Sequence, residues 1–294
     1  MSEGAVAESR ARWRDYLEVS KPRVVALMIF TAAVGMFLAS KAMVPWTVLV
    51  FGLAGIAMVA ASAAAINHLF DLRIDALMAR TRRRPLPRGA LHPHQVLLYA
   101  TGMGVLGTLL LARFTNASCT ALTLASSFGY AVIYTMYLKR ATPHNIVIGG
   151  AAGAAPPLLG WVAVTGHADV GALALFLIIF AWTPSHFWAL AIHRRDDYAK
   201  AGIPMMPVTH GVRNTARQIL VYTLVLFGAA LLPAAIGMAG ALYVIVAVLA
   251  GARFVVYAWR LYFASDLSVA MPMFRYSITY LGVLFATLLI DHYR

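Results

Sequence analysis

Residues 44–75 read VPWTVLVFGLAGIAMVAASAAAINHLFDLRID, an apolar run followed at once by Asn67, Asp71 and Asp75. The apolar part, residues 44–66, is long enough to cross the hydrocarbon of a bilayer as one α-helix, which needs about 20 apolar residues. If the helix continues beyond it, the three polar side chains share one face, because helical residues four apart lie above one another. This stretch therefore predicts a membrane span that ends in a polar site.

Long apolar runs of the same kind recur along the whole chain. Of the 294 residues, 61% are hydrophobic and 12% are charged, which is too apolar for a water-soluble globule. Backbone amides in lipid must be satisfied within their own segment, so these runs are predicted to be helices. The sequence predicts an all-α, polytopic membrane protein with about nine transmembrane helices around a central cavity open to the cytoplasmic side. The predicted spans are 24–40, 44–66, 95–113, 117–138, 146–164, 170–191, 219–239, 241–259 and 275–291.

Positive charge is concentrated on one side of this predicted bundle. Of the 24 lysine and arginine residues, only Lys41, Arg113 and Arg294 fall on the opposite side. By the positive-inside rule the amino terminus is expected to be cytoplasmic. Its acidic residues are untypical of a mitochondrial transit peptide, so we expect a multi-pass protein of a bacterial inner membrane. Orientation in the lipid bilayer accounts for the +13 net charge, and nucleic acid is not an expected partner.

The chain is predicted to form a single integral membrane domain over residues 1–294. It would comprise a cytoplasmic amino-terminal segment, 1–23, and two long cytoplasmic loops, 67–94 and 192–218, which are the candidate active-site loops. Both loops begin with aspartates, continue through basic residues and contain two closely spaced prolines. The spacing suggests a weak repeat of four helices, without sustained residue identity.

The first loop carries the stronger chemical signal. Two carboxylates four residues apart on one helix face repel each other, so a cation is expected beside Asp71 and Asp75. Mg²⁺ fits this expectation, because it prefers oxygen ligands and is typically held by one or two carboxylates together with substrate phosphates. The arginines that follow could pair with the same carboxylates or with phosphate oxygens, for which the guanidinium group is geometrically suited. A salt-bridge network at the membrane surface is the alternative interpretation.

The second loop reads HRRDDYAKAGIPMMPVTHGVRNTAR over residues 193–217. Adjacent aspartates cannot share one helical face, so we expect either Asp196 or Asp197 to face the cavity while the other pairs or caps. Lys200 is a candidate for a phosphate contact and Tyr198 for a hydrogen bond to it, although an interfacial tyrosine is an equally good interpretation. If the two acidic sites face each other, they could hold two metals on one diphosphate.

The chain resembles the UbiA-type intramembrane prenyltransferases, and within that family the branch that farnesylates haem. The first loop carries the asparagine–aspartate element of the whole family, and the strings TPHNIVIGG, HFWALA and DDYAKAGIPM select the haem branch. The second element lacks the DxxxD spacing of other branches, which leaves the number of metals open. The resemblance rests on residues 20–25, 67–87, 134–140, 142–161 and 182–207.

The resemblance implies that farnesyl diphosphate alkylates a vinyl group of haem B, with addition of water and release of diphosphate. It implies Mg²⁺ as the cofactor and a metal site of Asn67, Asp71, Asp75 and Asp197, with Asp196 as a further catalytic candidate. Haem A synthase or terminal oxidase assembly are the implied downstream partners. The diphosphate-binding residues it implies are Lys21, Arg80, Arg84, Lys139, Arg140, Lys200 and Tyr198.

Haem needs apolar walls, and a histidine could ligate its iron. His186, flanked by aromatic residues in WTPSHFWALA, is the first candidate; His193 and His68 are the others. Two alternatives stay open from the sequence: a prenyltransferase for a quinone precursor or other aromatic acceptor, and a haem carrier or transporter without chemistry. Cys119 is the single cysteine, so neither an intramolecular disulfide nor a cysteine metal cluster is available.

Overall fold

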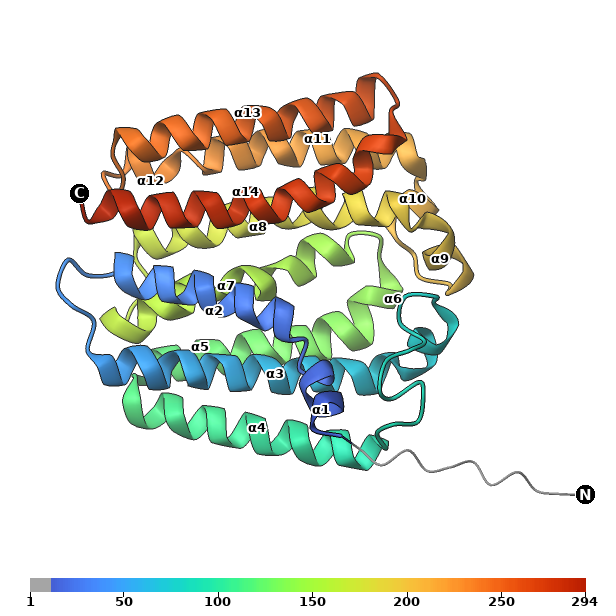
Figure 1. Cartoon of the computed structure of the whole chain (residues 1–294), viewed down its shortest axis with the longest axis horizontal. Coiled ribbons are helices and arrows are strands. Elements are labelled where there is room, and N and C mark those ends of the chain that lie inside the picture. Colours follow the sequence, from blue (N-terminus) through green and yellow to red (C-terminus); the bar gives the residue numbers. More distant parts are fainter. Residues whose placement is uncertain (1–11) are drawn as a thin grey trace, which may run out of the picture.

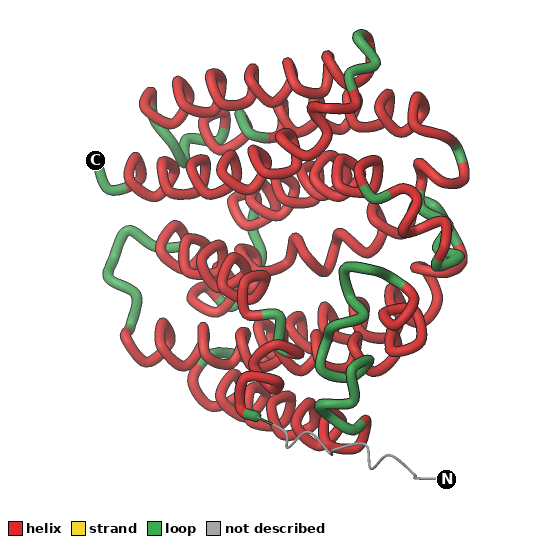
Figure 2. The backbone as a smooth tube through the Cα atoms, turned by 45° about the vertical axis from the view of Figure 1, so that its right-hand side comes forward, coloured by secondary structure: helices red, strands yellow, loops and turns green. Residues whose placement is uncertain are grey.

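The computed structural model describes residues 12–294, so most of the predicted amino-terminal segment, residues 1–11, lies outside it. The described residues fold into helices and connecting loops and contain no strand (Figure 2). The helices are α1 (Trp13–Val19), α2 (Pro22–Leu38), α3 (Trp46–Leu77), α4 (Pro93–Phe114), α5 (Ala117–Phe128), η1 (Gly129–Leu138), α6 (Lys139–Ala141), α7 (Asn145–Thr165), α8 (Val170–His193), α9 (Arg195–Lys200), α10 (Met206–Thr209), α11 (Gly211–Ala229), α12 (Leu232–Ala235), α13 (Ala241–Phe263), η2 (Leu267–Val269) and α14 (Ala270–His292).

The predicted spans correspond one by one to helices of the structure. Among the described residues, 8 helices are long and apolar enough to cross a membrane, and α1 with α2, bent by 58°, makes up to 9. The seventh and eighth spans are separate, because α12 ends at Ala235 and α13 begins only at Ala241. The all-α, polytopic fold class is confirmed.

The long helices lie side by side with their axes nearly parallel (Figure 1). Helices α8, α11, α13 and α14 pack together, and α3, α4 and α5 form the other side of the bundle. Helix α7 contacts α8 of the first group and α5 of the second, so it lies between the two groups, and it also packs against α2. Two glycines bring α2 and α7 into backbone contact: a Cβ at Gly35 would overlap the Pro157 carbonyl, and a Cβ at Gly160 would overlap the Ala32 carbonyl.

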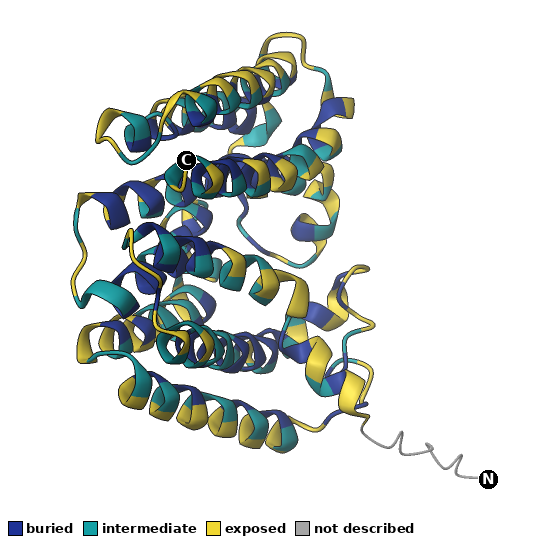
Figure 3. Ribbon diagram, turned by 60° about the vertical axis from the view of Figure 1, so that its left-hand side comes forward, coloured by how far each residue is buried: buried dark blue, intermediate teal, exposed yellow. Residues whose placement is uncertain are grey.

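Large apolar side chains also cover the outer surface of the bundle. Exposed residues alternate with buried ones along the outer helices, as expected where one face meets lipid (Figure 3). A cavity of about 410 Å³ opens between α3, α4 and α5, lined by residues such as Ser62, Gly104 and Leu124. It contains none of the predicted site residues, and its exposed lining indicates a lipid-facing groove.

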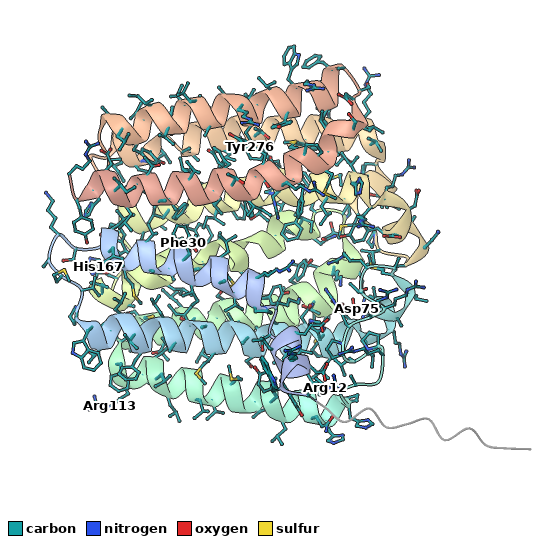
Figure 4. All side chains as sticks on the ribbon, in the orientation of Figure 1. Arg12, Phe30, Asp75, Arg113, His167 and Tyr276 are labelled. Carbon is teal, nitrogen blue, oxygen red and sulfur yellow. The ribbon has the colours of Figure 1, made fainter. Side chains whose placement is uncertain are left out.

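The short elements α1, α6, α9 and α10 gather at one end of the bundle, together with the loop 78–92 (Figure 1). Asp75 lies at this end, whereas Arg113 and His167 lie at the opposite end (Figure 4). Helix α3 continues to Leu77, so the first polar loop begins about ten residues later than the predicted 67–94. The second, 192–218, is partly helical, since α9, α10 and the start of α11 fall within it.

Candidate active site

The last turns of α3 form a buried polar surface inside the bundle. Asn67, Asp71 and Asp75 keep only 3%, 2% and 3% of their surface exposed. Their spacing of four places them on one face, as predicted, because α3 passes through this region without interruption. Buried carboxylates need compensating charge and hydrogen bonds, so their partners decide what this surface can bind.

Asp71 forms the centre of the surface. Lys139, at the start of α6, approaches Asp71 Oδ2 with Nζ at 2.6 Å. Asn67 Nδ2 donates to the same oxygen at 3.0 Å and contacts Thr135 Oγ1 at 3.1 Å. Asp71 Oδ1 is buried and has no partner among the described residues. One oxygen is therefore held by a cation and an amide, while the other is free to accept a ligand.

Lys21 reaches this surface from the bend between α1 and α2. Its backbone is in the left-handed region, with φ 51°, which is uncommon for a residue other than glycine. Its Nζ donates to Asn67 Oδ1 at 2.5 Å and to the Tyr130 hydroxyl at 3.1 Å. The strained conformation directs an ammonium group into the buried surface, as strained residues often do at functional sites.

A π-helix supplies two side chains that sequence reasoning missed. In η1, Tyr130 and Thr135 are five residues apart, and Thr135 Oγ1 donates to the Tyr130 carbonyl at 2.8 Å. The i, i+5 bonding of a π-helix places residues five apart on one side, toward Asn67 and Lys21. π-Helical turns are frequent at functional sites, but a pattern of 3.6-residue periodicity does not reveal them.

Asp75 is held by the loop that follows α3. Arg84 Nη1 contacts Asp75 Oδ2 at 2.7 Å, and Thr81 Oγ1 donates to the Asp75 backbone carbonyl at 2.9 Å. Arg88 forms an ion pair with Asp15 of α1, which ties the loop to the amino-terminal helix. Arg140, unlike its neighbour Lys139, bonds the Phe70 carbonyl at 3.2 Å. The loop thus brings Arg84, and the bend between α1 and α2 brings Lys21, to opposite ends of the carboxylate row.

The described residues contain no group of three or more histidine, cysteine or acidic side chains arranged to hold a metal. Magnesium does not require such a group, because it binds through one or two carboxylates, waters and substrate phosphates. The free, buried Asp71 Oδ1 and the amide oxygen of Asn67 fit this donor chemistry. Asn67, Asp71 and Asp75 are therefore the residues that could hold Mg²⁺, and the cations paired with them lie where phosphate would bind.

The second acidic patch, Asp196 and Asp197, is more exposed to solvent than the carboxylates of α3. Asp196 and Lys200 are exposed, and Asp197 is 22% exposed and lies 3.5 Å from Arg194. The structure does not bring either aspartate into one metal-type group with the carboxylates of α3. The physical reason is that α9 runs along the end of the bundle, where water and Arg194 already satisfy the carboxylates.

Tyr198 connects the two loops. It is buried, and burial raises the pKa of its phenol, whereas the guanidinium groups of Arg80 and Arg194 act in the opposite direction. Tyr198 and Met78 belong to one buried apolar cluster. Because Arg80 of the loop after α3 and Arg194 at the end of α8 both act on the Tyr198 phenol, the two loops lie close together there, through cationic groups and not through paired carboxylates.

The three histidine candidates lie in different environments. His186 is 7% exposed and stacks on Trp182 and Phe274 at 4.1 and 4.5 Å between ring centroids. His68 is 2% exposed, and neither of its ring nitrogens has a partner among residues 12–294. His193 is exposed at the end of α8, which disfavours it as a ligand inside an apolar pocket.

Known proteins resemble this chain over nearly its whole length. The model of the UbiA prenyltransferase family matches residues 28–281. A relative from Pseudomonas putida (strain W619), "Protoheme IX farnesyltransferase 1", is 60% identical over 288 residues, covering 98% of this chain and 97% of the relative. "Protoheme IX farnesyltransferase" of Azotobacter vinelandii (strain DJ / ATCC BAA-1303) is 60% identical over 289 residues, with 98% and 97% covered.

Solved structures share the fold at low sequence identity. A digeranylgeranylglyceryl phosphate synthase superposes with a TM-score of 0.80 at 17% identity, over 95% of this chain and 98% of that one. A UbiA homologue from Archaeoglobus fulgidus, bound to DMAPP and Mg²⁺, gives a TM-score of 0.67 at 17% identity, over 93% and 99%.

Proposed function

Because this chain belongs to the UbiA prenyltransferase family, we propose that its buried polar surface transfers a farnesyl group from farnesyl diphosphate to protohaem IX (haem B). The chain is an enzyme, a multi-span membrane prenyltransferase. The observation that carries the assignment of the site is the buried, unpartnered Asp71 Oδ1 beside the ammonium group of Lys139. An allylic diphosphate requires a carboxylate oxygen that can bind a metal and, beside it, a cation that can turn to phosphate.

The residues of the site act mainly on the leaving group. Lys21 and Lys139 bracket Asn67 and Asp71, and Arg84 lies beside Asp75. In the resting site these cations neutralise the carboxylates, so they are already placed where negative charge develops on the diphosphate. Arg80, Arg140, Tyr198 and Lys200 remain proposed diphosphate contacts from the surrounding loops.

Mg²⁺ held by Asn67, Asp71 and Asp75 would act as a Lewis acid on the diphosphate oxygens. A structure of a UbiA homologue bound to DMAPP and Mg²⁺ supports this cofactor. Asp197 stays a proposed further ligand, which Arg194 would have to release. Asp196 is exposed, and the proposed site does not use it.

The reaction balances without a nucleophilic side chain. The bond between C1 of the farnesyl group and oxygen breaks, and the electron pair leaves with diphosphate. The terminal vinyl carbon of haem B bonds to C1, water adds to the other vinyl carbon, and a proton is released to give the hydroxyethylfarnesyl group of haem O. The apolar bundle excludes bulk water from the cation until the carbon–carbon bond has formed.

The porphyrin would lie against the aromatic side chains of α8 and α14. His186 is the proposed iron ligand, because it is enclosed by Trp182 and Phe274 in an apolar environment. His68 lies next to Asn67 and near the diphosphate cations, which favours a polar contact with substrate over iron ligation. His193 is less suitable because it is exposed.

We propose a bacterial inner membrane as the location, with the amino terminus and the active-site end cytoplasmic. The bias of lysine and arginine toward that end supports this orientation, and bacterial relatives support the membrane. The product would pass to haem A synthase or to terminal oxidase assembly, as the family resemblance implies.

The decisive experiment is an assay with the purified full-length chain in lipid nanodiscs. Farnesyl diphosphate and Mg²⁺ are incubated with haem B or with an aromatic acid, and alkylated products are identified by mass. We expect a product only with haem B, and none when Mg²⁺ is removed by a chelator. A product from the aromatic acid alone would assign the chain to a different acceptor, and binding of haem without release of diphosphate would favour a carrier.

A further inference from the structure

The hydrogen bonds around His186 specify which ring nitrogen carries the proton. Ser277 Oγ of α14 lies 2.5 Å from His186 Nδ1 and 2.7 Å from the Phe274 carbonyl oxygen. A hydroxyl has one hydrogen, and a carbonyl can only accept. Both short contacts are hydrogen bonds only if Ser277 donates to Phe274 and the Nδ1–H of His186 donates to Ser277.

In this arrangement Nε2 of His186 carries no proton. A neutral imidazole with its proton on Nδ1 presents a lone pair at Nε2. None of the described residues bonds to Nε2, and the side chain keeps 7% of its surface exposed. With the opposite tautomer, one of the two contacts of Ser277 would have no hydrogen between its atoms, in a region where Ser277 itself is fully buried.

Two aromatic rings restrict the approach to this nitrogen. Trp182 and Phe274 stack on the imidazole at 4.1 and 4.5 Å, with interplanar angles of 16° and 26°. If Trp182 and Phe274 both stacked on the same face of the imidazole, their rings would occupy the same space. They therefore cover opposite faces of His186. Only the edges of His186 remain: Ser277 takes the Nδ1 edge, and Phe187 packs edge-to-face against the imidazole with 5.0 Å between ring centroids. The lone pair of Nε2 lies in the ring plane, which is the direction from which iron is ligated.

The same serine joins the two helices that carry the site. Trp182 Nε1 donates to the Ser277 backbone carbonyl at 2.8 Å. Trp182 and His186 are four residues apart on α8, so one residue of α14 fixes both. His186 lies seven residues before the end of α8, about 10 Å along the helix from the end that carries the polar surface.

We propose that Ser277 is a positioning residue, which holds His186 in the tautomer and orientation that let Nε2 ligate the iron of the haem substrate. This inference rests on the proposed haem transfer. Ser277 acts as the partner of a metal-ligating histidine does in other proteins, where the second nitrogen is bonded to an oxygen acceptor. No covalent or redox step is added to the reaction.

The first test needs no haem. The full-length chain with ¹⁵N-labelled histidine is studied by NMR in lipid nanodiscs, and His186→Gln identifies the signals of His186 by difference. We expect the Nδ1–H tautomer in the native chain and in Ser277→Thr, and a shift toward Nε2–H in Ser277→Ala. A native His186 protonated on Nε2 would overturn the proposal, whatever the result for the Ser277 variants.

The second test titrates haem B into each variant and records the optical and electron paramagnetic resonance spectra. We expect His186→Gln to lose the signature of a histidine ligand, and Ser277→Ala to bind haem about tenfold or more weakly. Ser277→Thr should restore both. Ser185→Ala is the matched control, because Ser185 is equally buried on α8 but bonds Thr223 and the Ile219 carbonyl and does not contact the imidazole.

The outcomes separate this inference from the proposed function. If His186→Gln loses the iron signature while Ser277→Ala keeps it at unchanged affinity, the role of Ser277 is refuted and haem transfer stands. If His186→Gln keeps the signature, ligation by His186 is refuted together with the role of Ser277. Product formation from haem B, measured separately by mass, then decides whether the proposed function survives.

Discussion

The two acidic patches share a pattern of aspartates next to basic residues but differ in structure. On α3, Asp71 and Asp75 are buried, and each has one cation within 2.7 Å. On α9, Asp196 is exposed and Asp197 shares a looser contact with Arg194. A carboxylate inside the bundle loses its hydration, and a charged partner is needed to offset that free-energy cost. A carboxylate at the rim is satisfied by water. The comparison teaches that burial, and not the presence of aspartates, distinguishes the proposed reaction centre from the outer patch.

Asp71→Asn should have the largest effect. It removes the negative charge that holds Lys139 and would hold Mg²⁺, so we expect kcat to fall on the order of 10²-fold or more. Release of diphosphate from farnesyl diphosphate, measured with saturating haem B, gives the rate, and a haem titration checks that the acceptor still binds. Unchanged activity in this variant would remove Asp71 from the mechanism.

Lys139→Met tests whether the cations that pair with the side chains of α3 occupy the positions that substrate and metal would take. Asp71 would lose its partner in a buried position, so the unfolding temperature should fall. Added Mg²⁺ should recover part of that loss if Asp71 binds the ion, while turnover stays reduced about 10- to 100-fold. Thermal unfolding with and without Mg²⁺ measures this; a loss that Mg²⁺ does not affect would favour a purely structural ion pair.

Asp197→Asn separates the patches directly. Its side chain is partly exposed and already engaged with Arg194, so we expect a decrease in kcat of about tenfold at most, seen mainly at low Mg²⁺. The Mg²⁺ dependence of turnover is the measurement. An effect equal to that of Asp71→Asn would show that the two patches contribute equally to metal binding.

Asp196→Asn should have the smallest effect. An exposed carboxylate without a described partner contributes little, so turnover and stability should stay within about twofold of the native values. The same diphosphate-release assay serves here, with Asp197→Asn as the neighbouring comparison. A large loss would place the outer patch in the reaction after all.

The sequence predicted the parts of the molecule that depend on regular patterns. The nine spans follow from apolar runs, and the shared face of Asn67, Asp71 and Asp75 follows from their spacing. The roles assigned to these side chains stay predictions until variants are measured. The spacing could not show which oxygen of Asp71 is occupied, since Lys139 reaches it from more than sixty residues away.

Irregular and long-range features could not be predicted in this way. A π-helix at Gly129–Leu138 looks like any apolar span in composition, and the left-handed backbone of Lys21 leaves no mark in the residue pattern. Ser277 and Phe274 lie in a final span that the sequence described only as apolar. Their importance appears only when α14 is packed against α8.

The backbone contacts between α2 and α7 have a mechanical consequence. Gly35 and Gly160 keep the two helices in close contact at two points, so we expect α2 and α7 to behave as one rigid unit. Lys21 directly precedes the first residue of α2, and therefore the position of its ammonium group depends on the helix contacts at Gly35 and Gly160, several turns away. We expect Gly160→Ala to change the angle between α2 and α7 and to move the Lys21 ammonium group away from Asn67. A defect in turnover could therefore originate far from any atom that contacts the reactants.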